Sequence, residues 1–147
     1  MTRIVLATNI SRPIEAVFEY VTTPAHWPEW HPASRGVSGA TDHSLLVGEE
    51  VTEDFVAGGR EGRCVWRVTQ REAPFLWTIA ASTAQVQAEI TYRLTETGEA
   101  TNFERDLSYT TSGLWFSILD FLLTRRRMRN ESRVALERLK ERLEHGE

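Results

Sequence analysis

The sequence contains one cysteine, no apolar run long enough to cross a membrane, and no excess of positive charge. Cys64 stands alone within an apparent strand, which excludes a disulfide framework and a cysteine-based metal site. The apolar run at residues 114–123 is far shorter than the roughly 20 residues that span a bilayer. The first residues also lack the apolar core of a signal peptide. We therefore expect a cytoplasmic protein.

Several functional motifs are missing as well. A net charge of −4 argues against a nucleic-acid-binding protein, and the basic cluster Arg125, Arg126, Arg127 and Arg129 is typical of a solvated helix face. The sequence has no nucleophile elbow, no phosphate-binding glycine loop and no nucleotide fingerprint. Covalent acyl chemistry and nucleotide use therefore have no support, and we expect no cofactor.

What the sequence does have is enough apolar material for one core. It has 147 residues, of which 41% are hydrophobic and 26% are charged. A chain of this size can close a core and leave a cavity within it. We find no internal repeat or low-complexity linker, so we predict a single domain over residues 1–147.

The C-terminal part of the chain predicts one long helix over residues 114–144. Ser112 or Thr111 can cap its start, and no proline interrupts it. At about 1.5 Å per residue such a helix is on the order of 45 Å long, so a sheet must curl around it. The first half is apolar on nearly every side, whereas the second half has one apolar stripe. That stripe consists of Met128, Ser132, Ala135, Leu136, Leu139 and Leu143.

The N-terminal part predicts a strand, a helix and a broken corner. Residues 3–10 are rich in β-branched side chains, and Pro13 then stands just inside a helix start. Apolar residues at helical spacing continue that helix to about Thr22. Residues 23–32 contain three prolines and two tryptophans, which predicts a short, broken helical corner.

The middle of the chain predicts six strands. They cover residues 35–39, 48–57, 62–71, 75–82, 85–94 and 100–110. The connections are too short for crossover helices, so the strands must form an antiparallel meander. Alternation from Val86 to Leu94 gives one apolar and one polar face. We expect the long helix to cover the apolar face.

Two charged residues interrupt the apolar face. Arg105 lies between Phe103 and Leu107, and Glu53 occupies a similar place on its own strand. A buried charge needs a partner. The functional interpretation is that Arg105 binds a carboxylate, phenolate or enolate of a ligand, with Glu53 as a general base. The structural interpretation is an ion pair across the fold, or a β-bulge that turns Arg105 outward.

His26 and His31 flank Glu29, but their spacing matches no metal-ligand motif. We therefore expect no metal site. We expect His31 to serve as a hydrogen-bonding or proton-transfer group at the mouth of a pocket. In that position it would lie beside Trp27 and Trp30.

Side chains with polar tips distinguish a cavity wall from a plain core. Alternation along the strands predicts that four such side chains point inward, namely those of Trp66, Trp77, Tyr92 and Tyr109. The complete set of predicted ligand-binding residues is Trp27, Trp30, Phe55, Trp66, Trp77, Tyr92, Phe103, Tyr109, Leu114, Ile118 and Leu122. The predicted catalytic residues are Arg105, Glu53 and His31.

The order of these elements resembles the START-like, or SRPBCC, superfamily, and its polyketide cyclase/dehydrase-like branch in particular. The resemblance spans almost the whole chain, and it is carried by residues 10–18, the corner at 27–30, and residues 47–51, 66–69, 73–77 and 136–144. It implies an α+β helix-grip fold, in which a curved antiparallel sheet wraps around the long C-terminal helix and two short helices follow the first strand. It also implies an enclosed hydrophobic pocket and no cofactor.

Some aromatases and cyclases of this superfamily are thought to hold a polyketide with a cavity arginine and aromatic residues, a role that Arg105 matches. The leading hypothesis is a protein that binds a small hydrophobic molecule, aromatic, polyketide-like or lipid-like. The alternative is a cofactor-independent cyclase, aromatase or dehydratase acting in the same cavity. A third hypothesis is an interaction module, with a homodimer as one arrangement, which would have a filled core and an exposed apolar patch.

Overall fold

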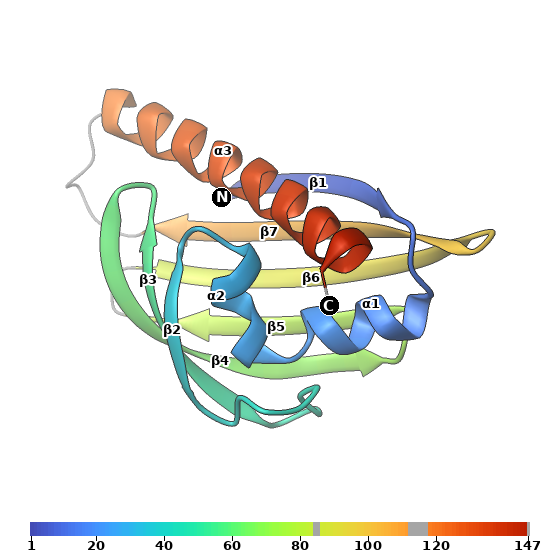
Figure 1. Ribbon diagram of the computed structural model, residues 1–147. Coiled ribbons are helices and arrows are strands. Elements are labelled where there is room, and N and C mark those ends of the chain that lie inside the picture. Colours follow the sequence, from blue (N-terminus) through green and yellow to red (C-terminus); the bar gives the residue numbers. More distant parts are fainter. Residues whose placement is uncertain (84–85, 112–117, 147) are drawn as a thin grey trace.

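The computed structural model describes residues 1–83, 86–111 and 118–146 (Figure 1). The elements, in chain order, are β1 (Thr2–Ile10), α1 (Ile14–Val21), a 3₁₀ turn (Pro24–His26), α2 (Trp27–Trp30), β2 (Ser34–Gly39), β3 (Glu50–Ala57), β4 (Arg60–Glu72), β5 (Leu76–Ser82), β6 (Val86–Thr97), β7 (Ala100–Thr111) and α3 (Ile118–His145). Every predicted strand and helix is present, with ends that differ by a few residues.

The described strands form one curved sheet in the order β1-β7-β6-β5-β4-β3-β2. All neighbouring pairs are antiparallel, and strands β2 to β7 follow one another as a meander. Strand β1 closes the sheet by pairing with β7. Figure 1 shows α3 lying across the concave face of this sheet, with α1 and α2 beside its C-terminal half. The predicted α+β helix-grip fold is confirmed.

Helix α3 packs on the sheet through the predicted stripe. Ser132, Ala135, Leu136, Leu139 and Leu143 are buried, and Met128 is partly buried against the core. The predicted start of the helix at residues 114–117 lies outside the described residues, as do the side chains up to residue 122.

The long helix does not cover the apolar face alone. The sequence predicted no other cover, but α1 buries Val17 and Phe18, and α2 buries Trp27 and Trp30. The Trp27 indole N–H donates to the Val21 carbonyl at 3.0 Å, which fixes the corner between α1 and α2. One end of the concave face is therefore filled by these helices, and the other end is left for α3 and the hairpin of β3 and β4.

Candidate functional site

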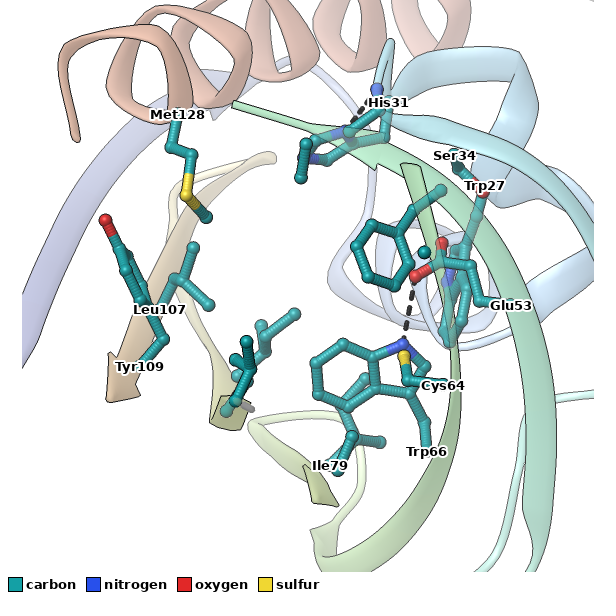
Figure 2. A pocket seen from close by; sticks show the side chains of 18 of the residues that line it. Trp27, His31, Ser34, Glu53, Cys64, Trp66, Ile79, Leu107, Tyr109 and Met128 are labelled. Atoms are coloured by element: carbon teal, nitrogen blue, oxygen red, sulfur yellow. Dashed lines mark hydrogen bonds between the residues drawn. The ribbon is translucent and has the colours of Figure 1, made fainter. Parts of the chain in front are cut away.

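A cavity of about 720 Å³ lies between the sheet and the N-terminal half of α3. Its walls are mostly apolar side chains from β3 to β7, and Figure 2 shows them converging on a common space. The wall residues are Trp27, Trp30, His31, Ala33, Ser34, Glu53, Phe55, Ala57, Arg60, Glu61, Gly62, Arg63, Cys64, Trp66, Ile79, Ala81, Thr83, Val86, Ala88, Ile90, Tyr92, Arg105, Leu107, Tyr109, Thr111, Thr124, Met128 and Ser132. The volume falls within the usual range for small-molecule sites.

Most of the predicted site residues border this cavity. They are Trp27, Trp30, His31, Glu53, Phe55, Trp66, Tyr92, Arg105 and Tyr109. Leu114 lies outside the described residues, and so do the side chains of Ile118 and Leu122 in the first turns of α3. The residues of this set that lie on strands are distant in the sequence, and the alternation along each strand turns them toward the same cavity.

Trp77 and Phe103 were predicted to line the cavity, and this was wrong. Both are fully buried in the solid core below it. Trp77 stacks on Tyr92 at 5.3 Å between ring centroids, and its indole N–H donates to the Leu45 carbonyl. Phe103 packs edge-on against Trp30. The strand phase of both residues points inward, but both lie toward the end of the sheet that α1 and α2 fill.

Glu53 brings a carboxyl group to the cavity from β3. Its Oε1 accepts a hydrogen bond from the Trp66 indole N–H at 2.9 Å (Figure 2). Burial raises the pKa of Glu53, and this donor and the charge of Arg105 act in the opposite direction. Cys64, opposite Glu53 on β4, also lines the cavity. Burial, and then the charge of Glu53, raises the pKa of Cys64 to about 12, so its thiol stays protonated.

Arg105 brings a guanidinium to the cavity from β7, where only 7% of the residue is exposed. Its Nη1 donates to the Ser132 hydroxyl on α3 at 3.2 Å. Its Nε has no hydrogen-bond acceptor, and no carboxylate of the described residues comes within 4.0 Å of the guanidinium. The structural alternative, an ion pair with Glu53, is therefore absent. The outward-turning bulge is absent too, because β7 pairs with β1 and β6 in unbroken register.

His31 is a neutral histidine at the same polar end. Its Nδ1 accepts a hydrogen bond from the backbone N–H of Ala33 at 3.1 Å, so the proton of the neutral ring sits on Nε2. Nε2 is buried and has no partner within the described part of the chain. Burial, followed by the positive charge of Arg105, lowers the pKa of His31 well below its usual range.

His26 and His31 do not share one site. His26 pairs with Glu29 at 2.6 Å on the surface, whereas His31 faces the cavity. Among residues 1–83, 86–111 and 118–146, no group of three His, Cys, Asp or Glu side chains is arranged to hold a metal ion.

Two hydroxyl groups of the cavity wall were not predicted from the sequence. Ser34 and Ser132 both border the cavity, and the Ser34 hydroxyl lies close enough to Glu53 to help lower the pKa of that carboxyl group. Ser132 was identifiable as the one hydroxyl in the apolar stripe of α3. The site therefore presents a large apolar surface, with the hydrogen-bond donors Arg105 and His31 and the carboxyl group of Glu53 among its polar wall residues.

A seven-stranded antiparallel sheet that grips a long C-terminal helix around a cavity is the START-like, helix-grip fold. The protein TTHA0849 of Thermus thermophilus superposes with a TM-score of 0.81, at 16% identity over 97% of each chain. A START superfamily protein of Mycobacterium smegmatis superposes with a TM-score of 0.71, at 13% identity over 95% of this chain and 97% of that one. At these identities the similarity establishes the fold.

The family follows from the sequence. The profile of the family described as "Polyketide cyclase / dehydrase and lipid transport" matches residues 1–144, so the chain belongs to this family. A stretch of 61 residues is 34% identical to Penitrem biosynthesis cluster 1 protein I of Penicillium ochrochloron, and it covers 40% of each protein. In the described part of the chain, no helix has the length and apolarity needed to cross a membrane.

Proposed function

We propose that the protein binds a small, largely apolar, oxygen-bearing molecule in its cavity, of an aromatic, polyketide-like or lipid-like kind. The observation that carries this proposal is the cavity of about 720 Å³ with apolar walls and a polar end. An interaction module would have a filled core, so the cavity favours a small-molecule ligand over that hypothesis.

The polar end determines how such a ligand is oriented. The Nε of Arg105 and the Nε2 of His31 are buried donors without acceptors in the described residues, and each would gain a partner from a ligand oxygen. A carbonyl, phenolate or enolate oxygen suits the guanidinium best, because a charged donor makes the stronger hydrogen bond. The apolar part of the ligand would then lie along Trp66, Ile90 and Met128.

Two comparisons support this reading. The family description names polyketide cyclases and dehydrases together with lipid transport, and polyketides and lipids both have largely carbon frames. The name of the similar Penicillium protein refers to a biosynthesis cluster. Both point to small organic molecules.

One observation favours a second function, that of a cyclase or dehydratase. Glu53 is a carboxyl with a raised pKa that shares the cavity with Arg105, and a raised pKa makes a carboxylate a better general base. In this mechanism Glu53 takes a proton from a carbon next to a ligand carbonyl, and the electron pair moves to the carbonyl oxygen, where Arg105 stabilises it. The enolate carbon attacks a second carbonyl of the same molecule, and Glu53 returns the proton to the new alkoxide.

The binding proposal is tested with an apolar fluorescent probe such as ANS. We expect the native protein to bind the probe, and we expect aromatic or acyl compounds that carry a carbonyl or phenol to displace it. A native protein that binds neither the probe nor such compounds would contradict the proposal. Glu53→Gln separates the two functions, because it should keep binding and abolish only turnover.

A further inference from the structure

The exposed surface of α3 carries a basic face whose residues do not line the cavity. It consists of Arg125, Arg126 and Arg129, which lie within an arc of about 100° on the helix. All three are exposed, and none lies within 4.0 Å of a carboxylate among the described residues. The whole chain has a net charge of −4, so this positively charged face is opposite in sign to the protein as a whole.

The basic face lies at the end of the cavity that α3 and the β3–β4 hairpin close. Thr124 and Met128, on the same turns of α3, are cavity wall residues. The backbone N–H of Gly58, at the hairpin tip, donates to Glu131 Oε1 at 2.8 Å. Figure 1 shows the first turns of α3 beside this hairpin. A partner that binds the basic face would therefore sit beside this end of the cavity.

We propose that the basic face docks the protein on an anionic lipid bilayer. Arginine guanidinium groups form paired hydrogen bonds with phosphate, and polybasic segments bind anionic membrane surfaces. Leu123, next to the basic face, is 50% exposed and offers an apolar contact at the interface. Docking in this orientation places the apolar cavity next to the bilayer, where poorly soluble molecules collect.

Two other occupants fit the observations less well. A second copy of the chain would bring one basic face against another in a symmetric dimer, and like charges repel. A soluble acidic protein would match the arginines but would leave the exposed Leu123 without a role. The bilayer is favoured by three features together: arginines without a carboxylate partner among the described residues, an exposed leucine and an adjacent apolar cavity.

The test measures binding of the ligand-free protein to vesicles. One set contains phosphatidylcholine mixed with phosphatidylserine, and the other contains phosphatidylcholine alone. We expect binding only to the first set, weakening as salt is added. Arg126→Gln/Arg129→Gln should lower the affinity about 25-fold, since each arginine near an anionic surface contributes roughly fivefold. Neither residue lines the cavity, so probe binding in solution should stay unchanged.

The matched control is Arg67→Gln/Arg138→Gln, which removes the same charge from exposed positions on β4 and on the other side of α3. We expect this control to bind vesicles as the unmodified protein does. Equal losses in the two double variants, equal binding to the two vesicle sets, or no binding to either set would overturn the proposal. Vesicle binding is measured without a cavity ligand, and the proposed function is tested by probe binding in solution. A failure of one proposal can therefore be told apart from a failure of the other.

Discussion

The carboxyl group of Glu53 and the indole N–H of Trp66 are joined by a hydrogen bond of 2.9 Å inside the cavity wall. The two residues come from neighbouring strands, β3 and β4. The bond gives a half-buried carboxylate a donor in a mostly apolar site. Two predictions concern this pair, one for the donor and one for the carboxyl group.

Trp66→Phe should keep the aromatic packing and remove the donor. We expect the free energy of unfolding at neutral pH to fall by about 1.5–3 kcal/mol, because Glu53 then loses the hydrogen bond from the indole N–H. The pKa of Glu53 should also rise further. Urea unfolding of the single variant and of Trp66→Phe/Glu53→Gln measures the effect. If the double variant loses as much stability as the single one, the loss comes from packing and the prediction is wrong.

Glu53 also predicts a dependence of stability on pH. Burial raises its folded pKa above the usual 4.5, so the folded protein binds this proton more tightly than the unfolded chain. The resulting stabilisation is complete below pH 4.5 and is lost as the pH rises through the folded pKa. Glu53→Gln should remove this loss, so the variant gains stability relative to the unmodified protein as the pH rises. Glu50→Gln, an exposed position on the same strand, is the control and should run parallel to the unmodified protein.

Arg105→Met should retain or raise stability, by up to about 1–4 kcal/mol, because a hydrophobic side chain of similar size replaces a buried charge that has no ion-pair partner among the described residues. The affinity for ligands with an anionic or carbonyl oxygen should fall at the same time. Thermal melts and probe displacement measure the two effects, with Arg67→Met as an exposed control. A loss of about 3–5 kcal/mol would mean that Arg105 balances a charge in the fold.

Gly58→Ala should disturb the contact between the β3–β4 hairpin and α3. Gly58 has a φ of +60°, and an added Cβ would lie 2.8 Å from Thr124 Cγ2. Gly98→Ala is the matched control, because Gly98 has a φ of +71° and no atom within 4 Å of the added Cβ. The φ alone should cost each variant about 1–2 kcal/mol, and Gly58→Ala should lose more than Gly98→Ala. Equal losses in urea unfolding would show that the hairpin does not pack tightly on α3.

His31 should titrate far below an ordinary histidine. The folded protein keeps it neutral through pH 6.5, whereas the unfolded chain takes up a proton there, so its contribution to stability is lost as the pH falls. NMR of the imidazole nitrogens should show a neutral ring protonated on Nε2. His43 is an internal comparison, since hydrogen bonds to Asp42 and Glu49 raise its pKa. An imidazole of His31 that becomes charged near pH 6.5 would contradict this account of the polar end.

The sequence predicted the faces of the strands better than positions along them. Period-two phase correctly turned Arg105 and Tyr92 inward, because the unbroken antiparallel register of β6 and β7 pairs these two residues on the same face. The same phase placed Trp77 and Phe103 in the wall, because it contains no information about which end the helices fill.

The empty space itself could not be predicted from the pattern. The cavity depends on small side chains such as Ala81 and Ala88 facing α3, and on α1 and α2 occupying only one end of the concave face. The alternating pattern of apolar residues is the same whether the sheet faces a filled core or a cavity, because both need inward apolar residues. The difference lies in how the helices divide the sheet between them.

A substitution that fills the cavity shows whether a ligand binds inside it. Ala88 lines the cavity on β6, and its neighbour Gln87 points to solvent, so Ala88→Phe and Gln87→Phe add the same ring to opposite faces of one strand. The measurement is the dissociation constant of the apolar probe for the unmodified protein and both variants, each checked by its melting temperature. We predict a loss of affinity of about tenfold or more, roughly 1.4 kcal/mol, for Ala88→Phe alone. Equal affinity in all three folded proteins would contradict binding inside the cavity.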